Sequence, residues 1–191
     1  MTSKTFSSVT KGMAGAAAAL AIGAVGLLAP TGAEAASAPR GTVTVDGLNV
    51  RSAPTTNSSR VVTVDRGTTF ELRCLTEGPS VGGNTTWFAV GPDVGKWVSA
   101  NYVDARGTIP FCGEGNVVTA TVSGDPVLNS FNGPSIKDES VNEYQPGDEA
   151  RVLCTVTTSK VSGSAEWYRT PEDWLPGEYV NLPAGTDLPI C

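Results

Sequence analysis

A duplicated pattern of cysteine, tryptophan and tyrosine residues is the feature that most constrains the fold of this chain. Identical residues recur in the same order at a spacing of about 80 residues, with only small gaps between them. The matched pairs are Gly67 and Gly147, Cys74 and Cys154, Trp87 and Trp167, Trp97 and Trp174, Tyr102 and Tyr179, Val103 and Val180, and Cys112 and Cys191. The chain is therefore predicted to contain two copies of one small structural unit.

The second copy diverges from the first at its beginning. The expected correspondences in this segment are Gly47 with Gly124, Asn49 with Pro126, Val50 with Val127, and Arg51 with Leu128. Under this alignment the second copy loses both polar side chains of the opening segment. The second copy is therefore expected to have a different function from the first.

The four cysteines indicate disulfide bonds. Each copy holds two of them, one near its middle and one at its end. The first residues, described below, predict export, and an exported chain meets an oxidising environment. The simplest pairing closes each copy with one bridge, Cys74 with Cys112 and Cys154 with Cys191. A closed loop of about 40 residues would stabilise each copy by roughly 4 kcal/mol. Bridges between the copies are the alternative, and they would tie the two units rigidly together.

The local pattern of each copy is that of β-strands. Short runs with alternating apolar residues, such as residues 42–47 and 68–78, are separated by glycine and proline turns. No part of the mature chain has the apolar period of an amphipathic helix. The expected fold class is all-β, with two tandem small β-barrels at residues 41–112 and 117–191, each with its own core and one disulfide. Residues 113–116 are the expected linker.

The first residues have the layout of a secretory signal peptide. Lys4 and Lys11 precede an uncharged, alanine-rich run at residues 13–28, and residues 33–35 provide a small-residue cleavage site. A membrane anchor is the alternative, but the run is short for a bilayer span of about 20 residues. Residues 1–35 are therefore predicted to be a cleaved signal peptide. The mature protein is predicted to be secreted and not bound to a membrane.

Composition argues against several functions. The chain has a net charge of −6 and no basic run, whereas nucleic-acid binding requires clustered lysine and arginine. It contains no histidine, which removes serine–histidine–aspartate triads and the common zinc sites. The adjacent carboxylates Asp138–Glu139 and Glu172–Asp173 are expected to lie on solvated loops rather than to catalyse glycoside hydrolysis. The protein is predicted to be non-enzymatic, with no cofactor and no metal.

Four segments of the first copy occur together in one domain family. They are GLNVRSAP at 47–54, VVTVDRGTTFEL at 61–72, TWFAV at 86–90 and KWVSANYV at 96–103. Over about residues 41–104 the chain therefore resembles a bacterial SH3 domain, or SH3b. The second copy keeps only the turn at Gly147, EWYRT at 166–170 and EDWLPGEYV at 172–180. The resemblance implies an SH3-like barrel for each copy.

The resemblance also places candidate ligand contacts in the opening motif and the last strands of the first copy. These candidates are Asn49, Arg51, Trp97 and Tyr102. Arg51 has the alternative role of supporting a turn. Trp97 is expected to serve mainly as barrel framework, with an edge left for stacking, because tryptophan in a small barrel is rarely wholly buried.

The adjacent aromatic residues of each copy lead to a further expectation. The pairs Trp87–Phe88 and Trp167–Tyr168 lie in strand-like segments, where successive side chains point to opposite faces. One ring of each pair is expected to face inwards and the other outwards.

The chain is interpreted as a secreted, non-enzymatic binding protein. The resemblance implies that its SH3b-like domains recognise cell-wall peptidoglycan or its peptides. The alternative is an extracellular protein-partner module, such as an inhibitor of an exported enzyme. The acidic charge favours that alternative, because wall polymers are often anionic and repel a negatively charged chain.

Overall fold

The structure, a computed structural model, describes residues 38–123, 127–161 and 164–191. The expected signal peptide at residues 1–35 lies outside these ranges, as do Gly124 and Pro126. The described residues form β-strands and two short 3-10 helices, so this part of the chain is all-β as predicted. No helix within the described ranges has the length and apolar character needed to cross a membrane.

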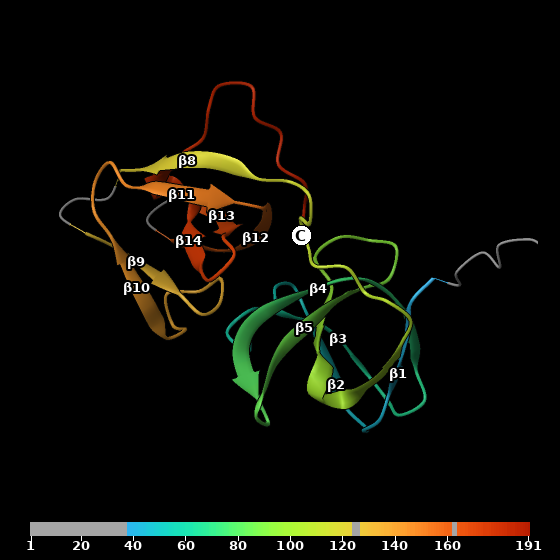
Figure 1. Ribbon diagram of the computed structural model, residues 1–191. Coiled ribbons are helices and arrows are strands. Elements are labelled where there is room, and N and C mark those ends of the chain that lie inside the picture. Colours follow the sequence, from blue (N-terminus) through green and yellow to red (C-terminus); the bar gives the residue numbers. More distant parts are fainter. Residues whose placement is uncertain (1–37, 124–126, 162–163) are drawn as a thin grey trace, which may run out of the picture. The chain divides into compact units, whose positions relative to one another are not determined.

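The strands of the first repeat form one curled antiparallel sheet (Figure 1). In chain order its elements are β1 (Arg40–Val43), β2 (Leu48–Arg51), β3 (Arg60–Val64), β4 (Thr69–Val81), β5 (Asn84–Val90), β6 (Trp97–Ser99), η1 (Ala100–Tyr102) and β7 (Val103–Arg106). The strand order across the sheet is β3-β2-β6-β5-β4-β1-β7. The long β4 pairs with β1 near its start and with β5 along the rest, so the sheet bends at this strand.

The second repeat has the same strand order with one strand divided. Its elements are β8 (Val118–Val122), β9 (Leu128–Phe131), β10 (Ser140–Tyr144), β11 (Glu149–Val152), β12 (Cys154–Val161), β13 (Ser164–Arg169), β14 (Trp174–Pro176), η2 (Gly177–Tyr179) and β15 (Val180–Asn181). They form the sheets β10-β9-β14-β13-β12 and β11-β8-β15. β11 and β12 together take the place of β4. The division falls at Leu153, and β4 has a bulge between Leu72 and Cys74 at the same place, which bends the strand.

Strand pairing corrects the expected alignment of the two opening segments. In the first repeat the facing residues are Leu48 and Val64, Asn49 and Thr63, and Arg51 and Trp97. In the second repeat the equivalent facing residues are Leu128 and Tyr144, Asn129 and Glu143, and Phe131 and Trp174. The counterpart of Arg51 is therefore Phe131, not Leu128, and the second copy keeps the asparagine. The register follows the buried leucine that begins each strand, because a slip by one residue would move the apolar side chains to the wrong face.

Each repeat has a hydrophobic core of its own. The first consists of Val43, Leu48, Val50, Leu72, Phe88, Val90 and Val98. The second consists of Ala120, Val122, Leu128, Ala150, Val152, Tyr168, Leu175 and Val180. Along β2, the buried Leu48 and Val50 alternate with the partly exposed Asn49 and Arg51. The strand that builds the first core therefore presents two polar side chains on its other face.

A third hydrophobic cluster takes its members from both repeats, and we call it the shared cluster. It consists of Cys74, Trp87, Ala89, Trp97, Cys112, Cys154, Val156, Trp167, Trp174 and Cys191. Two hydrogen bonds cross between the repeats beside it: Trp174 Nε1 donates to the Glu77 carbonyl at 3.1 Å, and Arg169 Nε donates to the Thr76 hydroxyl at 3.0 Å. The described residues belong to one compact unit. Sequence patterns predict two separate cores, and the structure adds this third one.

The disulfide bonds join Cys74 to Cys112 and Cys154 to Cys191, which is the pairing that one bridge per repeat predicts. In each repeat the bridge fastens a C-terminal tail to the strand that holds the first cysteine. Backbone hydrogen bonds form an isolated parallel β-bridge beside each disulfide. These β-bridges pair Leu75 with Phe111 and Thr155 with Ile190. The tail of each repeat is thereby held at one side of the shared cluster.

The adjacent aromatic pairs differ from expectation, because none of the four rings faces solvent. Trp87 and Trp167 belong to the shared cluster, whereas Phe88 and Tyr168 belong to the cores of their own repeats. Alternate side chains do point to opposite faces of these strands, as the sequence predicts. Both faces are covered, because each repeat covers a face that its neighbour would otherwise expose to water.

Candidate functional site

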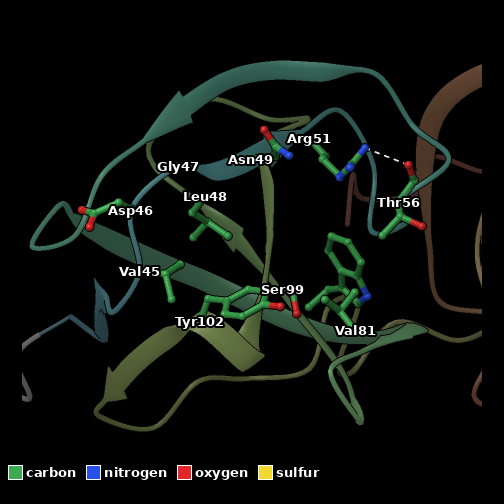
Figure 2. Close-up of a pocket in the computed structure, with 11 residues that line it drawn as sticks. Val45, Asp46, Gly47, Leu48, Asn49, Arg51, Thr56, Val81, Ser99 and Tyr102 are labelled. Carbon is green, nitrogen blue, oxygen red and sulfur yellow. Dashed lines mark hydrogen bonds between the residues drawn. The ribbon is translucent and has the colours of Figure 1, made fainter.

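A cavity of about 350 Å³ lies beside β2 in the first repeat (Figure 2). Its polar side chains are Asp46, Asn49, Arg51, Thr56, Ser99 and Tyr102. Apolar groups from Leu48, Val81 and Trp87 complete much of its wall. The cavity therefore combines an apolar lining with a few polar groups, as small-molecule and peptide sites do.

Three of the four candidate contacts from the sequence meet at this cavity. Asn49 and Arg51 project from the outer face of β2, and Tyr102 is the last residue of η1. Ser99 caps η1 by accepting a hydrogen bond from the backbone N–H of Asn101 at 3.3 Å, which helps to set the position of Tyr102. The fourth candidate, Trp97, is only 1% exposed and does not line the cavity.

Sequence reasoning missed the rest of the cavity wall. Thr56 comes from the turn after β2, Val81 from the end of β4, and Trp87 from the middle of β5. Trp87 carried a signal as one of the duplicated tryptophans, but that signal favoured a framework role. Thr56 and Val81 carried none, since their positions become neighbours only when the strands pair.

Arg51 is the cation of the cavity, and it also supports the following turn. Its Nη1 donates to the carbonyls of Thr56 at 2.8 Å and Ser58 at 2.9 Å. Burial lowers the pKa of Arg51 from its usual value, and the nearby positive charge of Arg60 lowers it further. Among the described residues, no carboxylate forms an ion pair with Arg51. The guanidinium remains charged and would gain from an anionic partner.

A carboxylate lies at the other end of the cavity. Figure 2 shows Asp46 at the end opposite Arg51, with Val45 and Leu48 between them. Asp46 accepts a hydrogen bond from the backbone N–H of Arg66 at 3.2 Å, and its other oxygen lies 4.0 Å from Arg66 Nε. Asp46 is thus already partnered at this end, whereas Arg51 has no counter-ion among the residues that the structure describes.

The second repeat does not preserve the chemistry of this cavity. Phe131 takes the position of Arg51, and its ring meets Trp167 edge-on with 5.7 Å between the centroids. Ile136 takes the position of Thr56 and is exposed. Phe131 packs against the shared cluster, so an aromatic ring replaces the cation.

Asp173 differs from its expected place on a solvated loop. Its side chain is 0% exposed, and its carboxyl group accepts hydrogen bonds from several buried or half-buried donors. These donors are the Ser130 hydroxyl at 2.6 Å, the Asn142 amide at 3.0 Å, the Tyr144 hydroxyl at 3.3 Å and the Thr170 hydroxyl. The group connects β9, β10 and the turn before β14, so its contacts are those of a structural carboxyl. Glu172, beside it, is exposed as expected.

The Tyr144 hydroxyl is expected to ionise unusually late. Burial raises the pKa of Tyr144 to about 12, and the neighbouring Asp173 adds to the effect. An unfolded tyrosine ionises near about pH 10. The folded state therefore favours the neutral hydroxyl, and this stabilisation is complete below about pH 10 and is lost as the pH rises towards 12. Ultraviolet titration should show a tyrosine component near pH 12 that Tyr144→Phe removes. An unchanged component in that variant would contradict the assignment.

Within residues 38–123, 127–161 and 164–191, no three acidic or cysteine side chains are grouped so as to hold a metal ion. The cavity beside β2 is accordingly lined by groups that bind through hydrogen bonds, charge and aromatic contact.

No family model matches the chain, and no curated protein matches it. Among solved structures, the chain is similar to one described as "Endolysin LysPBC5 CBD", with 12% sequence identity and a TM-score of 0.30. That match covers 79% of this chain and 98% of the other.

Proposed function

We propose that this protein is a secreted, non-enzymatic binding protein whose first repeat binds peptide segments of bacterial cell-wall peptidoglycan. In this proposal each repeat is a small barrel of the SH3b kind, which the segments at 47–54 and 96–103 resemble. The observation that carries the proposal is the cavity beside β2, at which Asn49, Arg51 and Tyr102 meet.

The charges of the cavity support a ligand with a free carboxylate. Arg51 is partly buried and forms no ion pair with a carboxylate of the described chain, so an anionic group on the ligand would offset its lost hydration. Its planar guanidinium matches the geometry of a carboxylate. Peptides of the cell wall carry free carboxylates and small apolar side chains. The latter suit the part of the wall made by Leu48, Val81 and Trp87.

The second repeat is proposed to bind no equivalent ligand. Phe131 replaces Arg51 at this position, and its ring packs edge-on against Trp167. One peptide should therefore bind per chain.

Replacement of Arg51 with alanine is expected to weaken binding to purified cell wall by about 10- to 100-fold. This corresponds to the loss of one charge-assisted hydrogen bond, worth about 1.5 to 3 kcal/mol. The free energy of unfolding should also fall, because Arg51 donates to two carbonyls of the turn. This loss should stay near about 1 kcal/mol, because the turn is partly exposed and water can replace the lost donor. Co-sedimentation with purified wall and thermal melts measure the two effects.

Arg60→Ala is the matched control for this experiment. It removes the same charge from an exposed neighbour that does not line the cavity, and its binding should stay close to that of the unmodified protein. Full binding by Arg51→Ala would remove Arg51 from the site. An equal loss in both variants would assign the effect to net charge instead.

An extracellular protein partner is the second candidate, and the free edge of the first sheet favours it. β3 lies at the end of the strand order, and its Val61 and Val62 are both exposed. An extended segment of a partner could add to such an edge through backbone hydrogen bonds. If wall does not co-sediment but one culture-supernatant protein binds and Arg51→Ala still captures it, this second function replaces the first.

A further inference from the structure

The turn at residues 52–59, which contributes Thr56 to the cavity wall, is held by a residue of the second repeat. The Asp138 carboxylate accepts a hydrogen bond from the Thr55 hydroxyl at 2.8 Å and another from the Asn57 side-chain amide at 2.6 Å. Asp138 is half-buried, although the sequence predicts a solvated loop for it. Its environment is therefore the contact between the repeats.

Arg51 holds the same turn through two of its other residues, Thr56 and Ser58. Asp138 binds the side chains of Thr55 and Asn57, and Arg51 binds the carbonyls of Thr56 and Ser58. Four consecutive residues of the turn are thus fixed, two by each partner. Because Arg51 takes its orientation from these carbonyls, whatever fixes the turn also fixes the guanidinium.

The position of Asp138 has a different role in the first repeat. Backbone hydrogen bonds of the two turns correspond, since Ser58 N–H donates to Thr55 O at 3.3 Å and Asp138 N–H donates to Ser135 O at 3.0 Å. Ser58 then bonds within its own turn, through a hydroxyl that donates to the Ala53 carbonyl at 2.9 Å. Asp138 reaches across to the other repeat instead. The two turns thus have equivalent backbone hydrogen bonds but different side-chain contacts. This difference indicates that the side chain of Asp138 serves the contact with the first repeat.

Gly133 provides independent evidence that this contact is closely fitted. A side-chain carbon on Gly133 would lie 2.5 Å from the Pro79 ring of the first repeat and 2.5 Å from the Asp138 carboxylate. Its counterpart in the first repeat is Ala53, which does carry that carbon. The absence of a side chain at Gly133 lets the two repeats approach closely enough for Asp138 to reach the turn.

The geometry points to Asp138 as a positioning residue for the cavity of the first repeat: it fixes the turn at 52–59 and, through that turn, orients the Arg51 guanidinium. The second repeat thereby supports a binding site that it does not itself contain. The inference rests on the proposed function only for the effect on a ligand, because the orientation of Arg51 can be measured without one.

Acceptance of hydrogen bonds, rather than charge, is the property of Asp138 that this role needs. Both bonds reach the same oxygen, Oδ1, and the other oxygen has no partner among the described residues. Burial raises the pKa of Asp138, whereas the hydrogen bonds from Asn57 and Thr55 act in the opposite direction. Asp138→Asn keeps a carbonyl oxygen for the two donors, so it should preserve the contact that Asp138→Ala removes.

The first experiment measures the turn in the full chain without ligand. Nuclear magnetic resonance should show a shifted Arg51 Nε–Hε signal, and faster amide hydrogen exchange at residues 55–58, in Asp138→Ala. Asp138→Asn should restore both. Glu139→Ala is the matched control, because it removes a carboxylate of the same turn that accepts a hydrogen bond from Asn132 of its own repeat. It should leave the Arg51 signal unchanged.

The second experiment measures binding of the same variants to purified cell wall. If the competent orientation of the turn falls to about a tenth, the apparent affinity of Asp138→Ala falls about tenfold. Asp138→Asn and Glu139→Ala should bind as the unmodified protein does. Since Asp138 acts through Arg51, Arg51→Ala combined with Asp138→Ala should bind no more weakly than Arg51→Ala alone.

The outcomes separate this inference from the proposed function. An unchanged Arg51 signal in Asp138→Ala overturns the positioning role, whether or not wall binds. A failure of Asp138→Asn to restore the signal, or an equal shift in Glu139→Ala, overturns it as well. A shifted and restored Arg51 signal in a protein that binds no wall supports the positioning role and overturns the proposed function.

Discussion

Replacement of Trp97 with alanine is expected to lower the free energy of unfolding by about 3 to 5 kcal/mol. Trp97 is 1% exposed and belongs to the shared cluster, so the substitution leaves a cavity where an indole ring was packed. A typical domain has only about 5 to 15 kcal/mol in total. Chemical denaturation under oxidising conditions, followed by tryptophan fluorescence and circular dichroism, measures the change.

The whole chain is expected to respond to this substitution as one unit. The cluster that holds Trp97 also contains Trp167 and Trp174 of the second repeat, so both repeats should unfold in one transition that moves to lower denaturant. Val62→Ala is the control, because Val62 is an apolar residue of the same repeat that is 48% exposed, and its effect should stay within about 0.5 kcal/mol. Two separate transitions, only one of which moves, would contradict a shared cluster. A stable Trp97→Ala that no longer binds wall would assign Trp97 to the ligand.

Replacement of Asp173 with alanine is expected to cost a similar amount, about 3 to 5 kcal/mol, for a different reason. Hydroxyl groups of Ser130 and Thr170 and the side-chain amide of Asn142 all donate to this buried carboxyl group. Alanine removes the carboxyl acceptor, so the Asn142 amide loses its partner and the two hydroxyls keep only their longer bonds to the carbonyls of Asn142 at 3.3 Å and of residue 173 at 3.2 Å. Each buried donor that loses its acceptor costs about 1 to 3 kcal/mol. Denaturation midpoints of the two proteins, measured in the same way, give the difference.

Two further substitutions distinguish a hydrogen-bond effect from a charge effect at Asp173. Asp173→Asn keeps one acceptor and turns the other into a donor that faces donors, so its loss of stability should be smaller than that of alanine but still measurable. Asp187→Ala removes a carboxylate that is exposed, and it should be close to neutral. If Asp173→Ala is as stable as Asp187→Ala, the network around Asp173 contributes little to the fold.

The two repeats share a strand order but differ in what their polar side chains do. In the first, Arg51 and Asn49 on the outer face of β2 line a cavity. In the second, Phe131 closes against Trp167. Buried polar groups are instead used for structure there, with Asp173 inside the second repeat and Asp138 at the contact with the first. The proposed function and the proposed role of Asp138 both follow from this asymmetry.

Much of the fold could be predicted from the sequence, because the relevant signals are local or repeated. Alternating apolar residues indicated strands, and the duplicated cysteines suggested one bridge in each copy, which is the pairing found. Three candidate contacts also meet at one cavity. Asn49 and Arg51 alternate with buried residues of β2, and that alternation places them together on its other face.

Errors arose where one surface meets another. Strand alternation predicts that one ring of the Trp87–Phe88 pair faces solvent, and the sequence predicts solvated loops at Asp138 and Asp173. All four are buried or half-buried, because they lie between layers or between repeats. The alignment of Arg51 with Leu128 failed for a related reason, since register depends on which side chains face the core and not on spacing from a glycine.

The repeat, the strands and the polar face of β2 can all be derived from the residue order, because they depend on neighbouring residues and on a backbone period of two. The burial of Trp97, the place of Trp87 in the cavity wall and the contact of Asp138 with Thr55 depend instead on how the strands and the two repeats pack. Those contacts join residues that are far apart in the chain. Whether they form depends on how closely two folded surfaces fit, and no local pattern of residues carries that information.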